Sequence, residues 1–144
     1  LHATHPDDLC DGEGVTVLMV ASKLGRTRSI KAILKAHGNP NHADPHGMTA
    51  LMGASYCFHP AAVELLAPIS DLNRQNQHGN TALIMAADRG HARCVEVLLQ
   101  HGASVTLANN DGETAVFKAA QRAATRSLNL LLEAGALADT RNEE

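Results

Sequence analysis

The fold is decided by the stretch NQHGNTALIMAADRGH, residues 76–91, because its pattern recurs four times along the 144-residue chain. The glycine of this stretch has a counterpart in every copy, at spacings of 33, 32 and 33 residues: Gly14, Gly47, Gly79 and Gly112. In each copy a threonine stands two residues after the glycine, an aliphatic residue four after it and an alanine seven after it. Recurrence at a fixed period of this length is typical of a solenoid, in which each copy is one structural unit.

The first half of each copy predicts a turn followed by a helix. The turn begins at an aspartate or asparagine, whose side chain bonds to its own backbone, and the glycine three residues later accepts a positive φ. Threonine is a good N-cap for a helix that starts at the next residue. The aliphatic residue and the alanine lie on one helix face, where the small alanine lets a second helix approach. The four turns begin at Asp11, Asp44, Asn76 and Asn109.

The second half of each copy predicts a longer helix with an apolar stripe. Its aliphatic cluster recurs as Ile33-Leu34, Leu65-Leu66, Leu98-Leu99 and Leu131-Leu132. In the third copy, Val95, Leu98 and Leu99 are expected to form the buried stripe. A glycine after the cluster indicates a helix C-cap. Three copies have such a glycine, at Gly38, Gly102 and Gly135.

A turn, a short helix, a second turn and a longer helix within about 33 residues closely resemble the ankyrin repeat, and the resemblance covers residues 11–141. It implies an all-α fold, a solenoid of stacked helix-turn-helix units with short β-turn or hairpin connections. We expect a single domain over residues 1–144. Its repeats are predicted at 11–43, 44–75, 76–108 and 109–144, after the end of a preceding partial repeat at 1–10.

Two departures from the repeat predict local irregularities. In the second copy, Pro68 stands where the second helix should end, so we expect a distorted helix end there. In the fourth copy, Ala123-Ala124 replaces the Gly-His pair that joins the two helices of the third copy. That replacement puts the connection in the fourth copy in question.

The composition fits a globular protein and excludes several classes of function. Apolar residues make up 44% of the chain and charged residues 19%, as in soluble folded domains. A formal charge of −3 does not favour a nucleic acid as partner, and no apolar run is long enough to insert into a membrane. The basic residues of the first repeat are expected to form a solvated face; they are Lys23, Arg26, Arg28, Lys31 and Lys35.

The cysteines and the start of the chain give expectations about location. Cys10, Cys57 and Cys94 are odd in number and include no C-x-x-C pair. This pattern favours a reducing, intracellular setting, most simply the cytoplasm, over a secreted disulfide scaffold. The first residues do not resemble a signal peptide. Because the chain begins at Leu1 rather than Met, we expect it to be a piece of a longer protein.

Nine histidines suggest a metal site, but their spacing disfavours it. His46 and His78 hold matching positions in adjacent repeats, roughly 10 Å apart at helix-packing distance, whereas zinc–nitrogen bonds are about 2.0–2.1 Å long. His42 and His46 flank a turn, and no third ligand is evident. No nucleophile, phosphate-loop or zinc-hydrolase motif is present, and Cys94 is expected to be a small buried apolar residue. We predict no enzyme, no metal and no cofactor, with a histidine-based hydrolase or metalloprotein as the weakest alternative.

The resemblance implies a function in protein binding. Partners of this family commonly bind the concave face, which is made of the turn tips and the exposed side of each first helix. We therefore expect a protein or peptide partner and a chain that is monomeric in isolation. Carried over position by position, the predicted face comprises Glu13, Lys23, Leu24, His46, Met48, Tyr56, His78, Asp88, Arg89, Asp111, Glu113 and Arg122.

Two parts of this face are of most interest. Leu24, Met48 and Tyr56 are expected to form an apolar spot, and tyrosine is favoured at interface hot spots. The charged side chains next to it are predicted to offer further contacts; they are Asp88, Arg89 and Arg122. Two alternatives stay open: the face is merely solvated, or the array is a structural spacer or regulatory unit within a larger scaffold, channel or enzyme.

Overall fold

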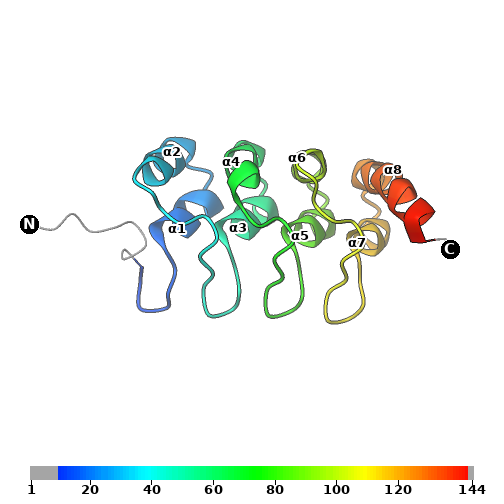
Figure 1. Ribbon diagram of the computed structural model, residues 1–144, viewed down its shortest axis with the longest axis horizontal. Helices are drawn as coiled ribbons and strands as arrows, with labels where there is room; N and C mark the ends of the chain where they lie inside the picture. The colour runs from blue at the N-terminus through cyan, green and yellow to red at the C-terminus, as the bar shows by residue number, and fades with distance from the viewer. Residues whose placement is uncertain (1–9, 143–144) are drawn as a thin grey trace, which may run out of the picture.

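Two parallel rows of helices make up the part of the chain that the computed structural model describes, residues 10–142 (Figure 1). The inner row consists of α1 (Val17–Lys23), α3 (Ala50–Tyr56), α5 (Ala82–Asp88) and α7 (Ala115–Gln121). The outer row consists of α2 (Thr27–Lys35), α4 (Pro60–Leu66) with the short 3-10 helix η2 (Ala67–Ile69), α6 (Ala92–Gln100) and α8 (Thr125–Asn142). Long loops project from the inner row like fingers, and the all-α solenoid predicted from the sequence is confirmed.

Each inner helix begins at the predicted threonine. In all four copies the threonine hydroxyl accepts a hydrogen bond from the backbone N–H three residues later, at 3.2–3.3 Å. The threonine backbone is extended while the next residue is helical, which is the geometry of an N-cap. The predicted N-caps are therefore confirmed at Thr16, Thr49, Thr81 and Thr114.

The fingers are closed by the predicted turns. In every finger one side-chain oxygen of the first residue accepts two backbone N–H groups at 2.9–3.0 Å; these residues are Asp11, Asp44, Asn76 and Asn109. The turn glycines have φ between 77° and 79°. Neighbouring fingers are also joined, because the amide of Gln77 donates to His46 O and the amide of Asn110 donates to His78 O. Each finger is thus held by bonds to its own Asp or Asn side chain, and the last three fingers are also bonded to one another.

The core lies between the two rows and repeats from one inner helix to the next. Helices α1, α3, α5 and α7 pack in that order, each against its neighbour. Leu18, Leu51 and Leu83 occupy equivalent layers and are each 1% exposed, whereas Val116 on α7 is half-buried. The alanines three residues further along are buried in all four copies, as the sequence predicts.

The buried stripe of α6 differs in part from the predicted one. Val95 and Leu98 are buried as expected, but Val97 is also buried and Leu99 only partly so. Helix α6 packs against α4, α5 and α8 at once. A helix with neighbours on three sides buries a wider arc than one apolar stripe, and Leu99 lies at the margin of that arc.

Only one of the three predicted glycine caps is correct. Gly102 takes a positive φ of 92° after α6. In the first copy the left-handed residue is His37 instead, with a φ of 67°, because the His-Gly pair stands one place later relative to the aliphatic cluster. Gly135 lies inside α8, which continues to Asn142, because the helix-favouring run Ala-Leu-Ala comes after it instead of a turn.

The two predicted irregularities have different outcomes. The distorted helix end at Pro68 is confirmed, since α4 ends at Leu66 and a 3-10 turn takes its place. The connection at Ala123-Ala124 is regular: Ala123 adopts a φ of 54°, and the amide of Ala124 donates to Ala119 O at 2.9 Å. The corresponding bond in the third copy has the same length. The position therefore keeps its geometry without glycine.

The remaining expectations concern the basic residues of the first repeat, the start of the chain and membrane-spanning helices. The five basic residues of the first repeat are all exposed, as predicted. The predicted partial repeat at 1–10 lies outside the described residues apart from Cys10. Among the helices of the described region, none combines the length and the hydropathy required to span a bilayer.

Candidate functional site

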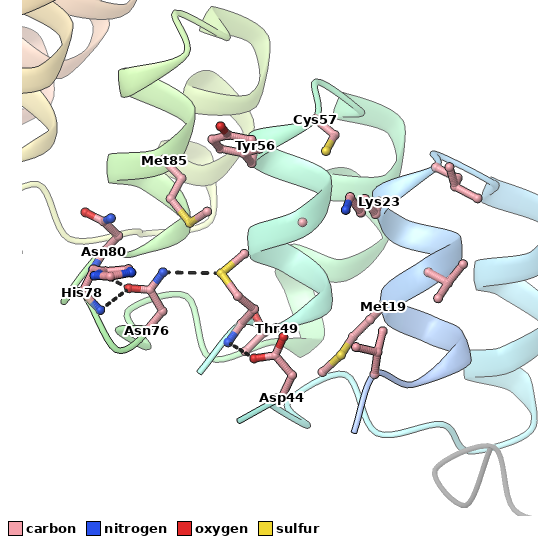
Figure 2. Close-up of a pocket in the computed structure, with 15 residues that line it drawn as sticks. Met19, Lys23, Asp44, Thr49, Tyr56, Cys57, Asn76, His78, Asn80 and Met85 are labelled. Atoms are coloured by element: carbon pink, nitrogen blue, oxygen red, sulfur yellow. Dashed lines mark hydrogen bonds between the residues drawn. The ribbon is translucent and has the colours of Figure 1, made fainter. Parts of the chain in front are cut away.

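A groove runs along the inner row of helices on the side of the fingers, and we call it the inner groove. It has a volume of about 680 Å³. Side chains at the C-terminal ends of α1 and α3 lie on one side of it and the fingers on the other (Figure 2). Its lining comprises Val15, Met19, Val20, Lys23, Leu24, Asp44, Met48, Thr49, Gly53, Tyr56, Cys57, Asn76, His78, Asn80 and Met85.

The inner groove has its hollow at Gly53. The position four residues after the capping threonine faces the groove in three consecutive copies, as Val20, Gly53 and Met85. On α3 no side chain occupies this place. A Cβ built on Gly53 meets nothing nearer than the Lys23 side chain at 3.8 Å, so the site has room for a side chain. The hollow therefore exists because one repeat carries glycine where its neighbours carry Val20 and Met85.

The predicted apolar spot lies within the inner groove. Leu24 and Tyr56 are 56% and 40% exposed, and Met48 is half-buried. The sulfur of Met48 accepts a hydrogen bond from the Asn76 side chain at 3.4 Å, which holds it against the next finger. Lys23 and His78, also predicted, complete the part of the predicted face that lines the groove.

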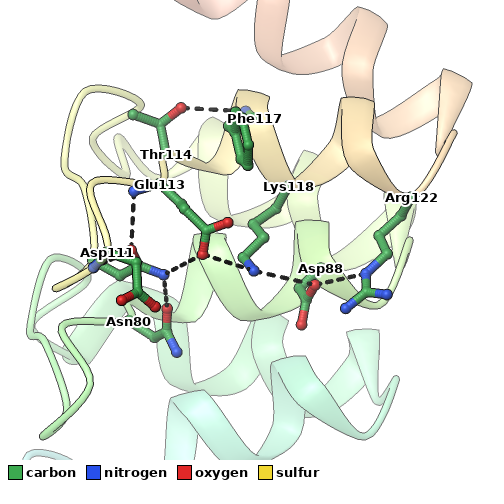
Figure 3. A network of polar contacts seen from close by, with 9 residues as sticks. Asn80, Asp88, Asp111, Glu113, Thr114, Phe117, Lys118 and Arg122 are labelled. Atoms are coloured by element: carbon green, nitrogen blue, oxygen red, sulfur yellow. Dashed lines mark hydrogen bonds and ion pairs between the residues drawn. The ribbon is translucent and has the colours of Figure 1, made fainter.

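The predicted charged residues form a network of their own beside Tyr56. Arg122 Nε donates to Asp88 Oδ1 at 2.9 Å, and Lys118 Nζ lies 3.9 Å from the same oxygen (Figure 3). Lys118 also contacts the Glu113 carboxylate at 2.9 Å. The hydrogen bonds from Lys118 and Asn109 lower the pKa of Glu113. The carboxylates of Asp88 and Glu113 are therefore engaged within the protein, which the sequence did not indicate.

Arg89 is placed differently from the other predicted charges. Its guanidinium lies 4.9 Å from the centroid of the Tyr56 ring, a cation–π contact between neighbouring repeats. Together with Asp88 and Arg122 these two residues line a shallow depression of about 370 Å³ next to the inner groove.

The other predicted residues lie at the fingers, outside the groove lining. Glu13, His46 and Asp111 are exposed in the first, second and fourth fingers. The ring Nδ1 of His46 is 3.3 Å from the Gln77 side-chain oxygen, so this histidine contacts the next finger.

Sequence reasoning missed the central position of the site, Gly53, and its neighbour Met85. The signal was available in the comparison of the four copies at one position, where Val20, Gly53, Met85 and Lys118 stand.

The sequence also did not indicate the stacking of Phe58 on His91, whose ring centroids are 4.9 Å apart. His91 Nε2 is 3.0 Å from Tyr56 O, and burial lowers its pKa. His91 thus fixes the connection between the second and third repeats.

Two observations on the described residues concern metal binding and thiol chemistry. Among the side chains described, those of residues 10–135, no three His, Cys, Asp or Glu come together in a way that would hold a metal ion. Cys94 is fully buried, as predicted, and burial raises the pKa of its thiol to about 11. A thiol with this pKa stays protonated and unreactive near neutral pH.

Comparisons with known proteins agree with the architecture. A sequence model described as ankyrin repeats (3 copies) matches residues 1–76 and 54–142. The chain is 35% identical over 96 residues to human ankyrin repeat domain-containing protein 63, covering 63% of this chain and 25% of that protein. It is 39% identical over 83 residues to the human photoreceptor ankyrin repeat protein, covering 54% and 18%. It is 35% identical over 97 residues to the Caenorhabditis elegans ankyrin repeat and KH domain-containing protein mask-1, covering 65% and 4%. The chain thus spans a quarter or less of the length of these relatives.

Proposed function

Because the chain belongs to the ankyrin-repeat family, whose repeats generally serve as protein-interaction modules, we propose that it binds a protein partner in the inner groove without catalysing a reaction. The observation that carries this proposal is the groove itself. It combines apolar side chains with a half-exposed tyrosine, and tyrosine is enriched among the residues that dominate binding energy.

The groove has a fixed shape before any partner arrives. One of its walls is held by the backbone N–H groups that donate to the Asp44 and Asn76 side chains and by the bond from Gln77 N to His46 O between these two fingers. The capped inner helices hold the other wall. A surface that is ordered in advance loses little conformational entropy on binding, so more of the contact energy appears as affinity.

Affinity capture from the source cells, with the chain immobilised, tests this proposal. We expect specific partners to be recovered by the wild type and lost with Tyr56→Ala. The matched control is Arg93→Ala on the outer row, where Arg93 pairs with Glu64 and Glu96 away from the groove. Recovery of the same partners by both variants would refute binding in the groove, and recovery of none by the wild type would refute the interaction function.

A second function, as a spacer or regulatory array inside a larger protein, is favoured by the length of the relatives, since each is at least four times longer than the matched segment. The full-length sequence tests it. A catalytic or membrane domain beside the repeats, with an activity that changes when the repeats are deleted, would support this second function.

The free cysteines lead us to propose an intracellular setting for either function.

A further inference from the structure

We propose that the inner groove takes an extended acidic peptide that inserts one bulky apolar side chain into the hollow over Gly53. This inference rests on the proposed function and specifies the chemistry of the partner. It is drawn from the shape of the hollow, from the side chains that surround it and from the charges at its rim.

The shape of the hollow calls for a side chain from outside. Repeats on either side fill the equivalent place with Val20 and Met85, and only α3 leaves it open. The groove volume of about 680 Å³ lies within the range of about 300–1,000 Å³ that is typical of sites for small ligands. A short stretch of peptide with a single large side chain at Gly53 fits this space.

The surroundings of the hollow select an apolar side chain. Met19, Met48 and Met85 line the groove together with Tyr56. Methionine side chains are flexible and polarizable, so they adapt to aliphatic and aromatic groups alike. We therefore expect Leu, Met or Phe at the inserted position, with modest discrimination among them.

The rim of the groove selects an acidic flank. Lys23 lines the groove and is exposed, and Arg89 lies over the Tyr56 ring. Neither side chain forms an ion pair with a carboxylate of residues 10–135, the side chains that the structure describes. Two carboxylates beside the groove already have partners, because Asp88 pairs with Arg122 and Asp44 accepts two backbone N–H groups of its finger. Two cations are thus left to pair with carboxylates of a partner.

The test uses the 144-residue chain and an array of nine-residue synthetic peptides. The central residue is Leu, Phe or Ala, and the flanking residues are acidic, neutral or basic. We expect acidic peptides with a central Leu or Phe to bind about tenfold or more tighter than those with Ala, which corresponds to the burial of one large side chain. Acidic flanks should bind about two- to fivefold tighter than neutral ones, and this gain should fall with added salt.

Gly53→Met is the decisive variant. It places on α3 the side chain that α5 already carries at the same position, at an ordinary helical backbone with no close contact. We expect it to fold as well as the wild type, with an unchanged or raised melting temperature, and to lose the preference for central Leu or Phe. Lys23→Ala should lose part of the preference for acidic flanks and keep the preference for the central residue.

The possible results separate this inference from the proposed function. Equal binding by Gly53→Met, a preference for basic flanks, or no dependence on the central residue would overturn the inference. So would a dimer of the chain in sedimentation that Gly53→Met dissociates, since the occupant would then be a second copy. If cellular partners are still captured in a Tyr56-dependent manner, the proposed function stands while the inference fails. If no partner is captured, both fail.

Discussion

Replacement of Gly79 by alanine should destabilise the protein strongly, because both the backbone conformation and the space at this position require glycine. Its φ is 78°, a conformation that costs an alanine about 1–2 kcal/mol. Its Cβ would also lie 2.7 Å from the backbone N of Asn110, so the next finger must move. That finger is held by two hydrogen bonds, from Asn110 N to His78 O at 3.0 Å and from Asn110 Nδ2 to Gln77 O at 2.9 Å. Each of these bonds contributes about 0.5–1.5 kcal/mol. Together with the cost of the backbone conformation, their loss should lower the free energy of unfolding by about 2–5 kcal/mol.

Gly112→Ala is the matched control for this prediction. Gly112 holds the same position in the fourth finger with a φ of 77°, but nothing lies within 4 Å of a Cβ built there. It should therefore lose only the conformational part, about 1–2 kcal/mol. Urea denaturation monitored by circular dichroism at about 222 nm, where helical backbone absorbs, measures both variants. Equal losses in Gly79→Ala and Gly112→Ala would show that the contact between fingers contributes nothing to stability, contrary to this prediction.

Three further predictions concern single side chains. Ser22 and Ser55 hold the same position on α1 and α3, but only Ser55 Oγ donates to a helix carbonyl, at 2.8 Å, whereas Ser22 Oγ has no partner among the described residues. Ser55→Ala should therefore cost about 0.5–1.5 kcal/mol more than Ser22→Ala in thermal unfolding, and the reverse order would contradict the assignment. Burial lowers the pKa of His91 below 6.5, so the unfolded chain takes up this proton first and stability falls as the pH drops below about 6.5. In urea titrations at several pH values, His91→Gln should show a weaker fall than the wild type, and an identical fall would exclude His91 as a cause. In native protein near neutral pH, iodoacetamide should label exposed Cys10 and leave Cys94 unlabelled, as mass spectrometry would show; rapid labelling of Cys94 would contradict its burial.

The beginnings of the elements could be predicted because they depend on local chemistry. A threonine cap such as Thr81 and an Asx turn such as that at Asn76 are formed by residues two to four places apart in the chain. Helix ends were less predictable. Whether a glycine ends a helix depends on its register and on the residues after it, so Gly102 caps α6 while Gly135 lies within α8.

The site could be predicted only in outline. Family resemblance gives the face on which a groove lies, but not which charges on it are already paired. Asp88 is paired by Lys118 and Arg122 from the next repeat, and Arg89 lies over Tyr56 of the preceding one. Such pairings depend on the positions of side chains that belong to different repeats, as with Asp88 and Arg122, and no local pattern specifies them.

The methyl signals of the four methionines can report whether a partner occupies the inner groove. Met19, Met48 and Met85 line the groove, whereas Met52 is 1% exposed in the core and does not line it. A titration of the methyl-labelled chain with the captured partner, monitored by nuclear magnetic resonance, reports on all four at once. If a partner occupies the groove, the signals of Met19, Met48 and Met85 shift or broaden while that of Met52 stays in place. Saturation of the partner with all three groove signals unchanged would contradict binding in the groove.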